Sequence, residues 1–327
     1  MKNITIFIFN NASASTIVGP MDIFSSTGIF WNYFKKKDMK SYFKVELASL
    51  DGESVTCFNG LSISPHTSID HVDDTDLILL PAIVDDVFNA LKANAELLPW
   101  LIDQNKKGTP IASVCTGAFF LAEAGLLNHR KATTHWGFAD VLKQHYPKVK
   151  LDTRPLITKD RNILCSAGTS SWSELCMYII KAFYGIQLAM ECSKSLGLDM
   201  SRTTQEPYNV LTIPDNHKDS LIHDIQEWLQ SHYPEKISIS SLADQFMVSE
   251  RTLTRRFKKA TGSSPIVSLQ FIRIEAAKGF LEQNNLTIDE IAFKTGYEDI
   301  SFFRTLFKRH TGLSPNEYRK KFLGLYL

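Results

Sequence analysis

The chain has 327 residues and carries 36 Lys and Arg against 35 Asp and Glu, so its formal net charge is only +1 at pH 7. This balance gives no sign that the chain as a whole binds nucleic acid, and its length predicts two domains. No apolar run is long enough to cross a membrane, and the five cysteines show no metal-type pairing. The sequence therefore predicts a cytoplasmic protein with no membrane partner, metal or cofactor.

The first part of the chain alternates short apolar runs with helical patterns. The nearly continuous run at 77–80 indicates a strand buried on both faces, as in a parallel sheet between helices. These patterns predict an α/β domain over residues 1–195, with a doubly wound, flavodoxin-like sheet. Strands are expected at 4–9, 43–48, 77–80, 111–114 and twice near 149–165, and helices at about 18–33, 84–105, 116–125, after Trp136 and over 172–195.

A strand at 111–114 leads directly into Cys115, and a helix follows at once. This order is typical of a nucleophile elbow, in which a tight turn exposes the side chain. The helix N-terminus is expected to lower the pKa of the Cys115 thiol by favouring the thiolate. The spacing alone makes Cys115 a candidate nucleophile, although buried, inert cysteines are commoner than reactive ones.

Turn-forming residues over 196–217 interrupt the helical pattern and predict a linker. Beyond it, residues 218–327 hold 16 basic and 13 acidic side chains, a net +3. Residues 1–217 hold the other 20 basic and 22 acidic side chains, a net −2. The small basic surplus therefore falls on the second domain.

The second domain is helical throughout and contains a repeat. The segment RFKKATGSSP at 256–265 returns as LFKRHTGLSP at 306–315, which marks duplicated units. In the first copy, a helix at 241–246, a turn and a second helix capped by Ser249 give the order of a helix-turn-helix.

The second copy has the same order of signals. Thr287 and Glu290 form a capping box, Gly296 supplies the turn, and Asp299 caps a helix that runs to about His310. Another capping box over 314–317 opens the final helix. We therefore predict an all-α domain with two helix-turn-helix units.

A helix that begins at Pro265 and ends near Gln283 would join the two units. At 1.5 Å per residue it is roughly 28 Å long, close to the ~34 Å that separates successive major grooves. Basic helix faces are often only solvated surface, but two of them, each after a helix-turn signal, predict double-stranded DNA as the partner. Arg, Thr and Ser can read base edges and Lys can hold phosphates, and the predicted contacts are Arg251, Thr254, Arg255, Lys258, Lys259, Ser301, Arg304, Thr305, Lys308 and Arg309.

Residues 220–323 resemble the AraC/XylS DNA-binding domain as a whole. The resemblance rests on GYEDISFF at 296–303 and GLSPNEYR at 312–319. It implies a sequence-specific transcription regulator that binds an operator. Arg304 and Thr305 stand where the family more often has Ser and Arg.

Residues 1–195 resemble the PfpI-type, glutamine-amidotransferase-like fold. The matching stretches are SVCTGAFFLAEAGLL at 113–127 and ATTHW at 132–136, with Gly19-Pro20 and 166–168 each before a helix. Together the two halves resemble the GlxA group of AraC-type regulators. The resemblance implies a homodimeric sensor of a small, nitrogen-containing or amino-acid-derived effector, and the predicted ligand-binding residues are Cys115, Thr116, His135 and Thr16.

The catalytic relatives of this fold need a base or acid near the thiol and an oxyanion cradle. Thr116 stands where protease-like members have His, and Thr16 where hydratase-like members have Asp. The Pro-Gly-Gly cradle is replaced by Pro81-Ala82-Ile83. We therefore predict that the protein is not an enzyme and that Cys115 and His135 are vestigial catalytic residues.

Two alternatives to effector sensing stay open. The first is a cysteine-dependent hydrolase or hydratase fused to a DNA-binding domain, with His135 as the base. The second is redox sensing through Cys115, because exposed thiolates oxidise readily.

Overall fold

The protein is described by a computed structural model over residues 1–72, 74–283 and 285–323. The chain divides into two compact units, Met1–Gln205 and Glu206–Leu327. The division falls inside the predicted linker of residues 196–217. In the described ranges, no helix combines the length and the apolar character that a membrane span needs.

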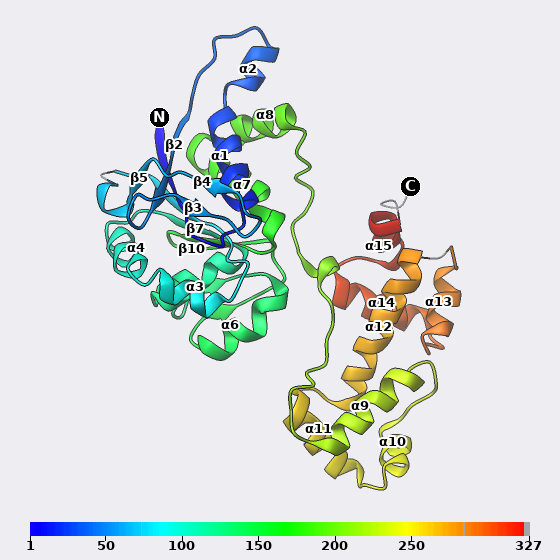
Figure 1. The fold of residues 1–327 in the computed structure, drawn as a ribbon. Coiled ribbons are helices and arrows are strands. Elements are labelled where there is room, and N and C mark those ends of the chain that lie inside the picture. Colours follow the sequence, from blue (N-terminus) through cyan, green and yellow to red (C-terminus); the bar gives the residue numbers. More distant parts are fainter. Residues whose placement is uncertain (73, 284, 324–327) are drawn as a thin grey trace. The chain divides into compact units, whose positions relative to one another are not determined.

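The first unit is built on a mixed sheet with the strand order β10-β11-β7-β6-β1-β2-β5 (Figure 1). All neighbouring strands are parallel except β10 and β11. When the five longer parallel strands β1, β2, β6, β7 and β11 are numbered 1 to 5 in chain order, they lie across the sheet in the order 2-1-3-4-5, which confirms the flavodoxin-like sheet. The strands are β1 (Lys2–Phe7), β2 (Phe43–Ser49), β5 (Thr67–Ser68), β6 (Leu77–Leu80), β7 (Ile111–Val114), β10 (Ile157–Asp160) and β11 (Ile163–Ser166).

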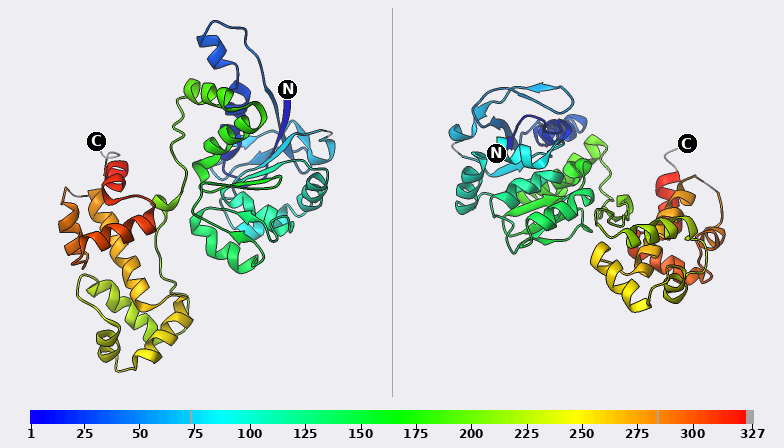
Figure 2. Two further views of the ribbon diagram at one scale, coloured as in Figure 1. Left: turned by 180° about the vertical axis from the view of Figure 1, so that it is seen from behind. Right: turned by 60° about the horizontal axis from the view of Figure 1, so that its bottom comes forward.

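Helices cover both faces of this sheet (Figure 1, Figure 2). On one face α1 packs against α7 and α8, and on the other α5 packs against α3 and α4. Two short ribbons, β3 with β4 and β8 with β9, lie outside the main sheet. The bounds are α1 (Ser15–Ser26), α2 (Phe30–Phe34), β3 (Val55–Thr56), β4 (Ser62–Ile63), α3 (Val87–Ala93), α4 (Leu97–Lys106), α5 (Ala118–Glu123), β8 (Lys131–Ala132), α6 (Ala139–His145), β9 (Lys150–Leu151), α7 (Trp172–Tyr184) and α8 (Ile186–Leu196).

Three predicted helices are each two helices in the structure, so their predicted lengths are wrong. The helix expected at 18–33 is interrupted at Gly28, whose φ of 80° is left-handed and whose added Cβ would clash with the Lys40 carbonyl oxygen. The helix expected at 84–105 is broken between α3 and α4, where Asn94 ends α3. The helix expected at 172–195 is broken at Gly185, with a φ of 89°.

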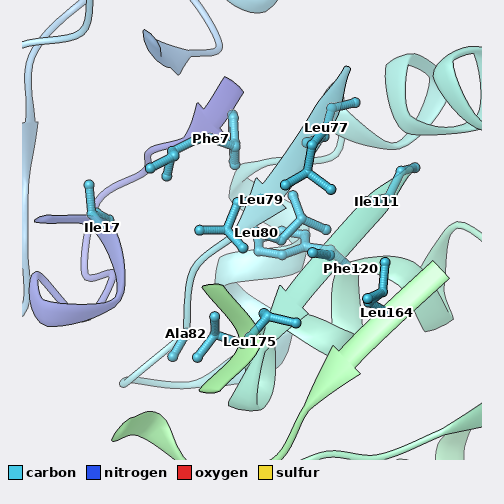
Figure 3. Close-up of a cluster of buried hydrophobic side chains, with 14 of the residues drawn as sticks. Phe7, Ile17, Leu77, Leu79, Leu80, Ala82, Ile111, Phe120, Leu164 and Leu175 are labelled. Atoms are coloured by element: carbon cyan, nitrogen blue, oxygen red, sulfur yellow. The ribbon is translucent and has the colours of Figure 1, made fainter. Parts of the chain in front are cut away.

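The centre of the sheet is the hydrophobic core of the first unit. The strand residues Phe7 and Leu79 and the α5 residue Phe120 are fully buried there (Figure 3). The Phe120 ring meets the Phe7 ring edge-on at 6.2 Å. Each such side chain contributes about 1.5–3 kcal/mol when it is buried. This packing fixes α5 against the sheet and so sets the position of the turn between β7 and α5.

In the second unit, residues 220–283 and 285–323 form helices joined by short turns, as predicted (Figure 1). Two separate apolar cores are present: Phe257 and Leu269 belong to the first, and Ile274 and Phe303 to the second. Helix α12 contributes to both cores and therefore joins them. The helices are α9 (Ser220–His232), α10 (Ile239–Gln245), α11 (Glu250–Thr261), α12 (Pro265–Gln283), α13 (Ile288–Lys294), α14 (Ile300–Thr311) and α15 (Pro315–Phe322).

The predicted helix caps are confirmed. The side chains of Ser249 and Asp299 accept hydrogen bonds from main-chain amides at the starts of α11 and α14. The capping boxes at Thr287 and Ser314 are both present. These caps satisfy amides that have no partner inside the helix, which is why short polar motifs predicted the boundaries well.

The buried residues of α12 do not form a single stripe. Leu269 and Ala277 are buried, whereas Ile272 and Phe280 are only half-buried. Ile274, Lys278 and Leu281 are buried as well. The reason is that α12 packs against two cores on different sides, so its buried residues do not follow one face.

Candidate nucleic-acid interface and elbow site

Helix α11 presents a basic surface opposite its core contacts. Leu253 and Phe257 are fully buried one turn apart and hold the helix against the first core. Because residues on the other side of a helix then point outwards, the predicted contacts lie towards solvent. Arg251, Arg255, Lys258 and Lys259 are exposed and Thr254 is half-buried.

Helix α14 has the same arrangement around the buried Phe303 and Phe307. The Thr305 hydroxyl donates a hydrogen bond to the Ser301 carbonyl oxygen at 2.9 Å, so its proton is engaged within the helix. As an acceptor, the hydroxyl oxygen remains available. The predicted contacts Ser301, Arg304, Thr305, Lys308 and Arg309 are all exposed.

Arg304 is held by an acidic neighbour that the sequence did not reveal. Its Nη2 lies 3.1 Å from Asp289 Oδ1 on α13, with about half of each side chain exposed. An exposed pair of this kind is worth at most about 1 kcal/mol, so it orients Arg304 without withdrawing it from solvent. The two residues are on different helices, and only the turn between the helices brings them together.

Arg256 differs from its basic neighbours on α11. Its Nε donates to Asp219 Oδ2 at 3.0 Å, and Asp219 itself caps α9. Hydrogen bonding to Arg256 lowers the pKa of the Asp219 carboxyl. Arg256 therefore anchors α11 to the start of α9, a structural role distinct from that of the exposed Arg255.

The segment 206–217 lies along the helices of the second unit. The Leu211 amide donates to Glu275 Oε1 of α12 at 2.9 Å, and Lys278 Nζ lies 2.6 Å from the same carboxylate. Farther along, Gln226 Nε2 of α9 donates to the Pro214 carbonyl oxygen at 3.0 Å. This segment is therefore bonded to both halves of the unit.

Residues 196–205, the first part of the predicted linker, belong to the first unit. Gln205 is buried, and its Nε2 donates to the carbonyl oxygens of Thr134 at 2.8 Å and Thr153 at 2.7 Å. These bonds place the end of the first unit after Gln205.

The elbow in the first unit has strained backbone. Cys115 follows β7 with a φ of 55°, which is uncommon for a residue with a side chain. A Cβ on Gly117 would lie 2.6 Å from the Pro81 carbonyl oxygen, so the start of α5 packs directly on the end of β6. The sequence prediction of a tight turn is confirmed.

The prediction of an exposed thiolate at Cys115 is wrong. The residue is only 4% exposed, and its Sγ lies 3.6 Å from the hydroxyl of Thr169. Burial raises the pKa of the Cys115 thiol, and hydrogen bonds from Thr169 and Thr116 oppose this only in part. Removing a thiolate from water costs more than these hydrogen bonds return, so the neutral thiol is favoured.

Thr16 and Thr116 bind the loop that follows β6. The Thr116 hydroxyl donates to the Ile83 carbonyl oxygen at 2.6 Å. The Thr16 hydroxyl donates to Ser13 and accepts from the Ala82 amide at 3.0 Å. Both threonines are buried, so the structure brings them together with Cys115 around residues 81–83 and uses their hydroxyls internally.

The His135 ring is engaged in the turn that follows it. Its Nδ1 accepts a hydrogen bond from the Gly137 amide at 3.1 Å, and the ring lies 5.1 Å from Trp136. Burial lowers the pKa of His135, so the neutral imidazole is favoured. This arrangement matches a structural role for His135.

A cavity of about 340 Å³ lies at the same edge of the sheet, where the loops after β1, β2 and β6 meet. Cys115 does not line it. No sequence motif pointed to this cavity, although parallel strands place all these loops at one edge. Its polar lining comprises Asn10, Asn11, Ser49, Asp51, Asp85, Asp86, Asn89 and Asn94.

Each of the two units matches the model of a known protein family. The model of the DJ-1/PfpI family matches residues 2–182, and that of a helix-turn-helix domain matches residues 242–321. The HTH-type transcriptional regulator CdhR of Pseudomonas aeruginosa is 27% identical over 280 residues, which cover 85% of this chain and 82% of CdhR. The HTH-type transcriptional regulator GbdR of the same species is 26% identical over 276 residues, covering 83% of this chain and 73% of GbdR.

A solved structure supports the fold of the first unit. The crystal structure of an AraC family transcriptional regulator from Pseudomonas putida superimposes with a TM-score of 0.51 and 21% identity. The match covers 60% of this chain and 100% of that one. At this identity, the similarity establishes the fold alone.

Proposed function

Because the chain belongs to the DJ-1/PfpI family and also carries an AraC-type helix-turn-helix domain, we propose that it is a sequence-specific, DNA-binding transcription regulator. The observation that carries the proposal is the pair of capped helices, α11 and α14, each with an exposed row of Arg, Lys, Ser or Thr. Two relatives that each match more than four-fifths of this chain, CdhR and GbdR, are named as transcriptional regulators.

On duplex DNA, α11 and α14 enter two successive major grooves. Helix α12 has 19 residues, and at 1.5 Å per residue its length of about 28 Å suits the spacing of the grooves. Arg255 reads a base edge from α11, whereas Lys259, near the end of the helix, holds a phosphate. The buried Phe257 and Phe303 keep the helix faces oriented.

The test is a selection with the full chain from randomised duplexes, followed by binding competition against random DNA. We expect a two-part site whose parts are about one helical turn apart. Equal affinity for selected and random duplexes would contradict the proposal. The salt dependence should be measured for both, because phosphate contacts dominate non-specific binding.

For the first unit we infer effector sensing without turnover. The hydroxyls of Thr16 and Thr116 bind main-chain groups, and the Ala82 amide, which an oxyanion would need, is bonded to Thr16. The thiol of Cys115 is buried and its pKa is raised. These observations support sensing over a cysteine hydrolase or hydratase, and burial also disfavours a peroxide sensor.

The effector is expected at the carboxyl edge of the sheet, where Cys115, His135 and the cavity all lie. A calorimetric screen of small nitrogen compounds, paired with DNA binding, tests this. Unchanged DNA affinity with every compound would count against sensing. Turnover of an amide or isonitrile that disappears in Cys115→Ser would favour the enzyme instead.

We also propose that the regulator acts in the cytoplasm as a homodimer. The support is analogy with sensor domains of this fold, which often pair. Sedimentation of the full chain over a range of concentrations tests the dimer. A mass of one chain at every concentration, with and without operator DNA, would contradict it.

A further inference from the structure

Arg273 lies near the middle of α12, between the two helix-turn-helix units. Its Nε donates to the Tyr233 carbonyl oxygen at 2.8 Å, and its Nη2 donates to the Glu235 carbonyl oxygen at 2.7 Å. Both carbonyls belong to the loop between α9 and α10. One guanidinium group therefore binds the connecting helix α12 to the first helix-turn-helix.

The same guanidinium contacts the second helix-turn-helix unit. Its central carbon lies 5.2 Å from the centre of the Tyr297 ring, within the range of a cation–π interaction. Burial lowers the pKa of Arg273, and arginine still remains charged at physiological pH. Tyr297 is 5% exposed and packs on Phe303 of α14, so the contact reaches the second core.

Gly296 lies at the junction where the second helix-turn-helix meets Arg273 and the loop between α9 and α10. It has a φ of 83°, and an added Cβ would lie 2.8 Å from Arg273 Nη2 and 2.8 Å from the Pro234 carbonyl oxygen. The turn of the second helix-turn-helix thus closely approaches both Arg273 and the loop between α9 and α10. The exposed pair Lys236 and Glu298, at 3.6 Å, also crosses the junction but contributes little.

We propose that Arg273 is a positioning residue that fixes the spacing and relative rotation of α11 and α14, and so the spacing of the two DNA elements that this protein reads. The inference rests on the proposed function. The two helix-turn-helix motifs have separate cores, and the long helix α12 that joins them can bend between the cores. The Arg273 guanidinium crosses that hinge and bonds to both sides, which makes the pair rigid.

The planar fork of arginine is essential to this role. It donates two hydrogen bonds to fixed carbonyls and stacks on a ring at the same time, which a lysine ammonium cannot do. Rigidity matters because the second contact of a tethered pair is favoured only when both sites can be reached together.

The experiment uses the full chain and its selected operator, with none, one or two base pairs inserted between the two elements. Wild-type affinity is expected to fall steeply with insertion. Arg273→Ala is expected to bind the native spacing about tenfold more weakly, to lose most of its dependence on spacing, and to match wild type on an operator with one element scrambled. Arg273→Lys should resemble Arg273→Ala.

The matched control is Arg256→Ala, which removes an arginine that joins α11 to the start of α9 and, among the described residues, bonds to none in the second helix-turn-helix. It should keep the wild-type dependence on spacing. If the melting temperature shows that Arg273→Ala does not fold, the comparison with wild type is made with Arg273→Lys. Wild-type spacing dependence in a folded Arg273 variant would overturn the inference. A wild-type chain with no sequence preference would instead overturn the proposed function, and the two failures are thus distinct.

Discussion

Lys278 of α12 donates a hydrogen bond from its Nζ to the main-chain carbonyl oxygen of Asn209. The lysine is 5% exposed and also pairs with Glu275 at 2.6 Å. Glu275 in turn accepts from the Leu211 amide. The ion pair of the buried Lys278 with the half-buried Glu275 thus binds the segment 206–217 to the helix that joins the two DNA-reading units.

Lys278→Met should destabilise the second unit by about 2 kcal/mol, because a charge-assisted hydrogen bond is lost and a carboxylate is left without its partner. Urea unfolding of the full chain measures the change. The double variant Lys278→Met/Glu275→Gln should be less destabilised than the single one, since no unpaired carboxylate remains. A double variant that is as unstable as the sum of the two single variants would contradict the coupling.

Arg255→Ala should weaken binding to the selected operator by about 1–3 kcal/mol while leaving random DNA nearly unaffected. Lys259→Ala should weaken both duplexes alike and lower the salt dependence, because a phosphate contact carries no base information. Competition binding at fixed salt distinguishes the two. Equal effects of Arg255→Ala on both duplexes would rule out its role as a base reader.

Cys115 should react roughly tenfold more slowly with iodoacetamide in the folded chain than in urea at neutral pH, because burial raises the pKa of its thiol. The reactive thiolate should become more abundant only as the pH rises above the ordinary thiol value. Peptide mass spectrometry after timed labelling gives the rate at this cysteine. Rapid labelling of the folded chain at neutral pH would show that the thiol is exposed.

The ion pair of Asp219 with Arg256 should make the stability of the protein depend on pH in the acidic range. The folded-state pKa of Asp219 is lowered, so its contribution is present above the unfolded value of about 3.9 and is lost as the pH falls through the folded value. Asp219→Asn keeps a capping side chain but cannot titrate. Its stability deficit should therefore shrink as the pH falls below about 4, and a deficit that does not change with pH would contradict this.

Two glycine substitutions should have opposite effects. In Gly19→Ala the new Cβ would lie 2.6 Å from the Trp172 ring, so the first unit should lose about 1–3 kcal/mol. In Gly279→Ala, within α12, the Cβ has nothing within 4 Å, so the second unit should gain about 0.5–1 kcal/mol. Thermal unfolding of each variant measures both. A Gly19→Ala chain that unfolds at the wild-type temperature would show that the packing of Trp172 on Gly19 adapts freely.

Much of the second unit could be predicted because its signals are local. The cap at Ser249 and the box of Thr287 with Glu290 satisfy amides within one helical turn, so their spacing in the sequence suffices. The buried Phe257 and Phe303 follow helical periodicity in the same way. The exposed faces of α11 and α14 then follow from which residues remain.

The first unit was predicted less well at the level of its helices and its cysteine. Gly28 and Gly185 divide helices whose composition reads as continuous. The order of residues around Cys115 predicts a tight turn, but the thiol is buried and contacts residues distant in sequence, such as Thr169, which is 54 residues away. Spacing along the chain carries no information on such a distant cover.

The amino-acid sequence by itself determined the two kinds of domain, the apolar runs that form the strands, and the capped helices α11 and α14. It could do so because apolar periodicity and helix caps act over a few residues. Tertiary structure alone decided that Cys115 is buried and that Arg273 bonds to Tyr233, 40 residues earlier, while lying over Tyr297. These contacts arise only when distant segments pack, and desolvation and hydrogen-bond geometry exist only in that packed state.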